Sequence, residues 1–267
     1  MARANRHHLK GHIWHITHRC HKREFLLKFS KDKLRWLKWL FEAKKRFGLC
    51  ILNYTVTSNH VHLLVLDEKK DVIPKSIQLI AGRTAREYNQ RKKRRGAFWE
   101  DRYHATAVDT SIYLIQCLTY IDLNMLRACV IQHPSEWKYG GYNEIQNPKQ
   151  RYALINKQKL ADLLGISDCE HGLRATHKSW VKEKLKQGLL YRDSAWTESV
   201  AVGGKEFVER VKFKLGTNAI GRKIVANKNN FEIREEQEPY NTVLGAEKAF
   251  LSPKNMYFWN VYPENTI

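Results

Sequence analysis

The sequence predicts an α+β domain built on an antiparallel sheet, and three observations support this. Short β-prone runs alternate with two amphipathic segments over the first 108 residues. The run NHVHLLV, residues 59–65, alternates its side chains between two faces, as a half-buried strand does. Apolar residues make up 43% of the 267 residues, which is enough for a substantial core.

The first half of this domain follows directly from the pattern. Residues 12–18 (HIWHITH) predict a strand, and residues 31–47 predict an amphipathic helix that Gly48 ends. Residues 49–57 and 60–66 predict two further strands, joined as a hairpin. The sequence therefore begins strand, helix, strand, strand.

The second half completes the order. Pro74 opens a helix predicted over residues 74–90, and residues 97–108 (AFWEDRYHATAV) predict a fourth strand. A strongly apolar helix follows over residues 111–128. The order β-α-β-β-α-β with an added helix is the ferredoxin-like arrangement, in which helices cover one face of the sheet and leave the other face free.

The amino-acid composition of the chain changes after Pro134. Residues 134–150 hold two glycines and two prolines and predict a linker, so we divide the chain into domains at 1–148 and 149–267. The second is expected to be a mainly helical extension, and its chemistry is left open. Its predicted parts are helices over 157–188 and 205–215 and an irregular tail over 226–267.

Positive charge is concentrated in the first part of the chain. Residues 1–105 hold 25 basic and 9 acidic residues, a net charge of +16, whereas the remaining residues contribute only +4. Such a field suits a polyanion, most simply nucleic acid. A membrane partner is not expected, because the sequence has neither an apolar run of 18 residues nor a basic amphipathic helix with a bulky apolar face.

The five cysteines do not form a CxxC motif, and their number is odd. This usage favours reduced thiols over a disulfide framework or a zinc ribbon. We therefore expect a cytoplasmic, nucleoid-associated protein.

His60 and His62 are one residue apart in a strand and therefore point to the same side of the sheet. Two half-buried histidines with ordinary hydrogen bonds would be the simpler explanation. Two converging imidazoles are, however, a natural pair of metal ligands. A third ligand and a reactive group would have to come from elsewhere in the chain.

The helix predicted over residues 111–128 can supply both the third ligand and the reactive group. Tyr113 and Tyr120 are seven residues apart, and Asn124 follows Tyr120 by one turn, so the three share a face. Tyr113 leads an apolar run and is expected to pack in the core. Tyr120 has an amide as its neighbour, and an amide oxygen is a legitimate ligand for a hard divalent cation.

These motifs resemble those of the HUH single-tyrosine transposases, particularly the REP-associated tyrosine transposases. Asn59–Leu63 (NHVHL) matches their histidine–hydrophobe–histidine motif, and Tyr120–Asn124 (YIDLN) resembles their nucleophile helix. Residues 98–104 (FWEDRYH) and 15–19 (HITHR) resemble two of their strands. The resemblance covers roughly residues 10–140. It departs at Met125, where many relatives have proline.

The resemblance implies a metal-dependent endonuclease and strand transferase that acts on single-stranded hairpin DNA in transposition. His60, His62 and Asn124 would hold Mg²⁺ or Mn²⁺, and Tyr120 would attack the phosphate to form a 5′-phosphotyrosine link. The oligomeric state, monomer or homodimer, and the DNA sequence recognised remain open.

Basic residues are the expected DNA contacts. The run RKKRR joins the second helix to the fourth strand, and a solvated charged loop is the alternative for it. His15 shares a face with Thr17 and Arg19 and is a weaker candidate. The predicted DNA-binding residues are Arg91, Lys92, Lys93, Arg94, Arg95, Arg102, Arg19 and His15.

Three other functions are compatible with parts of the sequence. A domesticated hairpin-DNA-binding protein with little or no cleavage activity is the principal alternative, although His60, His62 and Tyr120 are all present. Another class of HUH nuclease is disfavoured by the YIDLN helix. An RNA-binding ferredoxin-like domain would place aromatic residues where the histidines stand.

Overall fold

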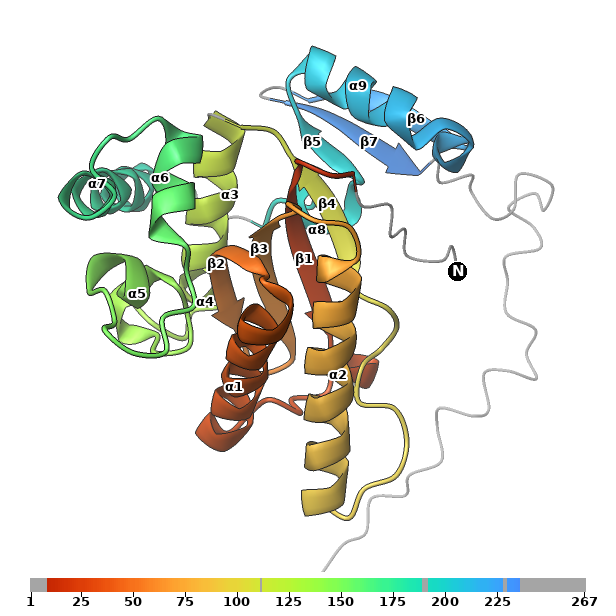
Figure 1. Ribbon diagram of the computed structural model, residues 1–267, viewed down its shortest axis with the longest axis vertical. Coiled ribbons are helices and arrows are strands. Elements are labelled where there is room, and N and C mark those ends of the chain that lie inside the picture. Colours follow the sequence, from red (N-terminus) through yellow and green to blue (C-terminus); the bar gives the residue numbers. More distant parts are fainter. Residues whose placement is uncertain (1–8, 111, 189–191, 228–229, 236–267) are drawn as a thin grey trace, which may run out of the picture. The chain divides into compact units, whose positions relative to one another are not determined.

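A computed structural model describes residues 9–235, except residues 111, 189–191 and 228–229. The strands among these residues form one sheet in the order β2-β3-β1-β4-β5-β7-β6 (Figure 1). They are β1 (Ile13–Arg19), β2 (Cys50–Val56), β3 (His60–Leu66), β4 (His104–Val108), β5 (Ala201–Gly203), β6 (Arg222–Ala226) and β7 (Phe231–Glu235). No helix in the described part of the chain is both long and apolar enough to cross a membrane.

The first four strands confirm the predicted α+β class and the ferredoxin-like order. β1 lies between β3 and β4 and runs antiparallel to both, and β2 pairs antiparallel with β3. Helices α1 (Ser30–Phe47) and α2 (Val72–Arg91) make the two connections between these strands and lie side by side over one face (Figure 1). Gly48 ends α1 at φ 73°, as predicted, because the left-handed conformation there suits glycine.

The fourth strand is shorter than predicted. β4 begins at His104, and the segment before it crosses the end of the sheet with a single bridge between Trp99 and Cys20. Trp99 donates its indole N–H to the Ala81 carbonyl of α2 at 3.1 Å, and its ring stacks on His18 at 4.0 Å. The aromatic residues that make this segment look like a strand instead fasten a loop to the helix.

The face of the sheet that carries the histidines is partly covered, although the sequence predicts a free face. Thr55 on β2 donates its hydroxyl to the Ile121 carbonyl at 3.1 Å, which brings the following helix onto this face. Thr106 on β4 donates to the Ser199 carbonyl at 2.7 Å, which brings the extension onto it as well. Buried hydroxyl groups need such partners, and remote segments of the chain provide them.

The predicted helix over 111–128 is divided in two. α3 (Ile112–Asp122) and α4 (Asn124–Arg127) are separated by Leu123, whose φ of -83° and ψ of 5° depart from helical values. The backbone N–H of Leu123 still donates to the Thr119 carbonyl at 3.0 Å, so the interruption is slight. Residue 111 lies outside the described residues.

The segment over 134–150 is not the linker that the sequence predicts. It contains a 3₁₀ turn (Pro134–Glu136) and α5 (Tyr142–Gln146), and the Gly141 N–H donates to the Tyr54 carbonyl at 2.8 Å. A Cβ atom at Gly141 would lie only 2.1 Å from the Asn53 side-chain oxygen. The glycine therefore permits close packing of this segment on β2 rather than a flexible connection.

The extension adds strands as well as helices. β5 pairs parallel with β4 and antiparallel with β7, so residues that the sequence assigns to a helical extension and an irregular tail continue the same sheet. Residues 236–267 of that tail lie outside the described residues. The helices are α6 (Lys157–Leu164), α7 (His171–Gln187), α8 (Ala195–Glu198) and α9 (Lys205–Leu215). The chain up to Arg234 clusters as one compact unit, and the domain boundary after residue 148 stays a prediction.

A buried polar network ties α3 to the extension. The Asp122 carboxylate accepts a hydrogen bond from His177 Nε2 of α7 at 2.8 Å and another from the Asn53 amide at 3.0 Å. Gln146 donates to the other ring nitrogen of His177 at 2.9 Å. Asp122 and His177 are both fully or almost fully buried, so these contacts determine how α7 packs against the helix that carries Tyr120.

Replacing His177 with leucine is expected to lower the free energy of unfolding by about 1–3 kcal/mol, because one oxygen of the buried Asp122 carboxylate would lose its partner. Urea denaturation of the full chain measures this. His171→Leu on the same helix is the control, since that side chain is 88% exposed. Equal stabilities of the two variants would show that the network does not stabilise the fold.

Candidate active site

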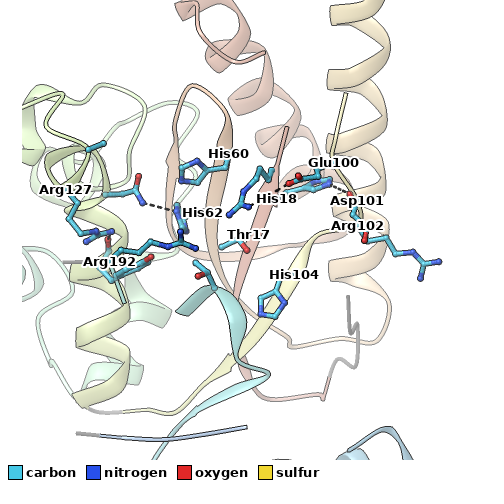
Figure 2. A pocket seen from close by; sticks show the side chains of 15 residues that line it. Thr17, His18, His60, His62, Glu100, Asp101, Arg102, His104, Arg127 and Arg192 are labelled. Carbon is cyan, nitrogen blue, oxygen red and sulfur yellow. Dashed lines mark hydrogen bonds and ion pairs between the residues drawn. The ribbon is translucent and has the colours of Figure 1, made fainter. Parts of the chain in front are cut away.

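Six of the predicted site residues line one pocket of about 410 Å³ at the histidine face. Strands, the loop before β4 and the α3–α4 helices all contribute to it. In Figure 2, Arg127 and Arg192 lie on one side of His62, while Glu100, Asp101 and Arg102 lie on the other. The six residues are Arg19, His60, His62, Arg102, Tyr120 and Asn124.

The alternation of β3 brings His60 and His62 to this pocket. Arg19 and Thr17 of β1 are their neighbours in the antiparallel register, so all four side chains are on one face. The rings of His60 and His62 have centroids 4.9 Å apart. The local prediction that the two histidines share a face therefore agrees with the sheet.

Both histidines are held as neutral imidazoles. Burial, assisted by the charge of Arg19, lowers the pKa of His60 to about 4. Burial also lowers the pKa of His62 well below its usual value. At neutral pH both rings are uncharged, which is the form that binds a metal ion.

The third predicted ligand is next to His62. Asn124 Nδ2 lies 2.9 Å from His62 Nε2. Rotation of the amide by half a turn would exchange this nitrogen for the oxygen, which is the atom that a hard cation accepts. No cluster of three or more histidine, cysteine, aspartate or glutamate side chains in the described part of the chain suits a metal ion. The donor set of two imidazoles and one amide oxygen fits Mg²⁺ or, more readily, Mn²⁺.

Tyr120 closes the pocket from α3. Its ring is perpendicular to that of His62, with centroids 5.9 Å apart, and the residue is only 8% exposed. The guanidinium group of Arg127 lies 4.0 Å from the centre of the phenol ring. Burial raises the pKa of Tyr120 above its usual value, while the charges of Arg127 and Arg192 oppose this rise.

Sequence reasoning did not select the other nine of the fifteen lining residues, and these include Arg127, Arg192 and Thr197. Arg127 follows Asn124 by three residues, and this spacing could have placed it on the same side of the helix. Arg192 and Thr197 belong to the extension, far along the chain from the motifs. No local pattern in the sequence marks those two residues.

His15 does not reach the pocket surface. The residue is fully buried, with Nδ1 at 2.8 Å from the Trp196 carbonyl oxygen and Nε2 at 2.9 Å from His62 Nδ1. The predicted direct contact of His15 with DNA therefore does not fit this structure. The segment around Trp196, which the sequence pattern could not place, covers the ring.

The basic run over 91–95 is outside the pocket lining, and its members differ in their contacts. Arg91 is paired with Asp32, which is buried between α1 and α2. Arg94 lies 3.6 Å from Glu24 and donates to the Ala97 carbonyl at 2.8 Å. These two arginines fasten the loop and helix, while Lys92, Lys93 and Arg95 are exposed. A role of the run in DNA binding stays a prediction.

Part of the chain, including some of the pocket residues, matches the model of a known protein family. Residues 8–124 match the family model described as "Transposase IS200 like". The match ends at Asn124, so Arg127, Arg192 and Thr197 lie beyond it. A search of curated proteins found no match.

The chain is also similar to solved structures. One is described as "Structure of the REP associates tyrosine transposase bound to a REP hairpin"; it is 17% identical, with 57% of this chain and 90% of that chain covered and a TM-score of 0.47. Another, provisionally described as a transposase from Deinococcus radiodurans R1, is 18% identical, with 40% and 87% covered and a TM-score of 0.32.

Proposed function

We propose that this chain, whose residues 8–124 match the IS200-like transposase family model, cleaves and rejoins single-stranded hairpin DNA through a tyrosine nucleophile. The observation that carries the proposal is the convergence of His60, His62, Tyr120 and Asn124 on one pocket. A REP-like hairpin or a transposon end is the substrate that the sequence motifs imply.

Tyr120 is the nucleophile in this proposal. Its phenol oxygen loses its proton and forms a bond to the scissile phosphorus. The bond from phosphorus to the 3′ oxygen breaks, and that oxygen gains a proton to become a 3′-hydroxyl. The product is a 5′-phosphotyrosine, which keeps the energy of the phosphodiester bond. A second 3′-hydroxyl can then reverse the step without ATP.

Arginines support the reacting groups from two sides. Arg127 and Arg192 favour the phenolate form of Tyr120 through their charge and can neutralise phosphate oxygens. Arg19 and Arg102 line the same pocket and are suited to the phosphates on either side of the cleaved bond. His60, His62 and Asn124 would hold a divalent cation, which when bound polarises the phosphate and makes the phosphorus easier to attack.

The decisive experiment incubates the full chain with hairpin DNA labelled separately on either side of the expected nick, in Mg²⁺, in Mn²⁺ and in a chelator. We expect the label on the 5′-phosphate side to travel with the protein on a denaturing gel, and only when metal is present. Attachment of the 3′-phosphate side would reject the mechanism. Tight hairpin binding with no adduct in either metal would favour the domesticated DNA-binding protein instead.

Neutralising the exposed part of the basic run is expected to weaken DNA binding in a salt-dependent way. In a variant with glutamine at Lys92, Lys93 and Arg95, the slope of log K against log salt should flatten by about 0.7 for each single-strand phosphate that the variant no longer neutralises. Arg91 is left intact, because its removal would leave the buried Asp32 carboxylate without its ion-pair partner. Fluorescence anisotropy at several salt concentrations gives the slope.

A matched variant separates local contacts from the overall charge. Glutamine at Lys178, Lys182 and Lys186 removes the same charge from exposed positions of α7. This control should change the slope little. An unchanged slope in the first variant, or an equal change in both, would place the basic run away from the DNA.

A further inference from the structure

We propose that His15 is a positioning residue that holds His62 in the tautomer with its proton on Nδ1 and its lone pair on Nε2. The inference rests on the proposed function, because the Nε2 lone pair matters there as a donor to the divalent cation. The observation behind it is a chain of three buried groups: the Trp196 carbonyl, His15 and His62.

The direction of the first hydrogen bond is determined by chemistry. A carbonyl oxygen can only accept, so His15 Nδ1, at 2.8 Å from the Trp196 oxygen, must carry a proton. The Thr106 hydroxyl lies 3.4 Å from this oxygen but donates its one proton to the nearer Ser199 carbonyl, at 2.7 Å. His15 is fully buried, and its ring nitrogens contact a carbonyl and an imidazole, neither of which balances a positive charge, so the ring carries no second proton. His15 Nε2 is therefore a lone-pair acceptor.

The second hydrogen bond follows from the first. His62 Nδ1 lies 2.9 Å from this acceptor and must donate to it. His62 is also buried, and neither His15 nor Asn124 balances a positive charge there, so with its only proton on Nδ1 its Nε2 has a lone pair. That lone pair faces Asn124, whose amide nitrogen is 2.9 Å away. The nitrogen on the pocket side of His62 is thus the one prepared to donate to a cation.

His60 is held in the same way by a different partner. Its Nδ1 lies 2.7 Å from the Asn59 Oδ1 atom, while Asn59 Nδ2 donates to the Arg23 carbonyl at 3.2 Å. The second contact orients the amide so that its oxygen faces the ring. His60 therefore also carries its proton on Nδ1. Two unrelated contacts impose the same tautomer on both members of the histidine pair.

The source of the His15 contact gives the extension a part in the site. Trp196 is in α8, far beyond Asn124, where the match to the family model ends. Its carbonyl is where the hydrogen-bond chain begins. The extension thereby acts on His62, the proposed metal ligand, indirectly through His15.

Two substitutions at His15 distinguish this role from simple core packing. The amide of asparagine reaches the place of Nδ1 and can keep the bond to Trp196, but it is too short to accept from His62. The amide of glutamine reaches the place of Nε2, where its oxygen can accept the His62 proton. His12→Asn is the matched control, because His12 also directs Nδ1 at a backbone carbonyl, that of Lys10 at 3.1 Å, and does not line the pocket.

The first measurement is the affinity for Mn²⁺ alone, by calorimetry on the full chain. We expect His15→Asn to weaken Mn²⁺ binding about 10–100-fold, as removal of an outer-shell partner does, while His15→Gln and His12→Asn stay close to wild type. Equal affinities for His15→Asn and wild type would overturn the proposal. Equal losses in the asparagine and glutamine variants would also do so, since core packing alone would then account for them.

The second measurement is the ¹⁵N spectrum of the histidine rings in the metal-free protein, with His62 assigned by comparison with a His62→Gln variant. Wild type and His15→Gln should show His62 protonated on Nδ1, and His15→Asn should show a mixture. If His62 is protonated on Nε2 in the wild-type protein, the inference is wrong, even if the His15→Asn variant proves unstable. Failure of wild type to bind Mn²⁺, with the expected tautomer, would instead reject the metal site of the proposed function.

Discussion

Replacing Tyr120 with phenylalanine is expected to abolish the covalent protein–DNA adduct while leaving hairpin binding nearly intact. The substitution removes only the phenol oxygen, so the packing of the ring against Arg127 and His62 is retained. Loss of a nucleophile typically lowers the rate by a factor on the order of 10⁴ or more. The denaturing-gel assay with end-specific labels measures the adduct, and anisotropy measures the binding.

Tyr113→Phe is the matched control on the same helix. Tyr113 is partly buried against the hydrophobic core and does not line the pocket, so this variant should form the adduct at the wild-type rate. An adduct in Tyr120→Phe, or its loss in Tyr113→Phe alone, would assign the nucleophile to Tyr113. Loss of hairpin binding in Tyr120→Phe would mean that the phenol oxygen serves recognition rather than chemistry.

The second large effect is expected when His60 and His62 are both replaced with alanine. A bound cation contributes several kcal/mol to the stabilisation of a transition state, so cleavage should slow by at least about a thousandfold in Mg²⁺. The phosphate contacts that give affinity come mainly from arginine and lysine, so most of the hairpin binding should remain. Single-turnover assays give the cleavage rate, and fluorescence anisotropy on the same preparation gives the affinity for the hairpin.

The buried position of His62 calls for a control on folding. Its side chain contacts His15 and Asn124, and a cavity at this site could unfold the pocket without any role for a metal. His60→Ala, at a less buried position, therefore serves as the second variant, and the circular dichroism of each variant checks its fold. Cleavage at the normal rate by either folded variant in Mg²⁺ would exclude the metal role of the residue replaced.

Local rules account for the parts of the fold that the sequence determines by itself. The period of two along a strand places His60 and His62 on one face, whatever the strand packs against. The helical period likewise places Asn124 beside Tyr120, and it survives the interruption at Leu123 because the backbone bonds continue across it. The β-α-β-β-α-β order follows from the same periodicities and is confirmed.

Contacts between remote segments account for what the sequence alone did not reveal. Residues 134–150 look like a linker, since their glycines and prolines mark turns, yet Gly141 is there to allow close packing on β2. The short strand β5 has only three residues, too few to show an alternating pattern, and becomes a strand because β4 and β7 lie beside it. Propensity is a weak guide for segments whose hydrogen bonds depend on distant partners.

The residues of the site can be divided in the same way, into those that the sequence identified and those that only the tertiary structure revealed. The residue types and spacing of His60, His62, Tyr120 and Asn124 were enough by themselves to select them as candidates. Only the tertiary structure decided that His15 is buried behind His62 instead of facing DNA, because the segment that covers it lies 181 residues further along the chain. Likewise, only the packing of the extension brings Arg192 to the pocket. A periodic pattern reports the face that a side chain takes, but what covers that face depends on the free energy of burying it against the rest of the chain.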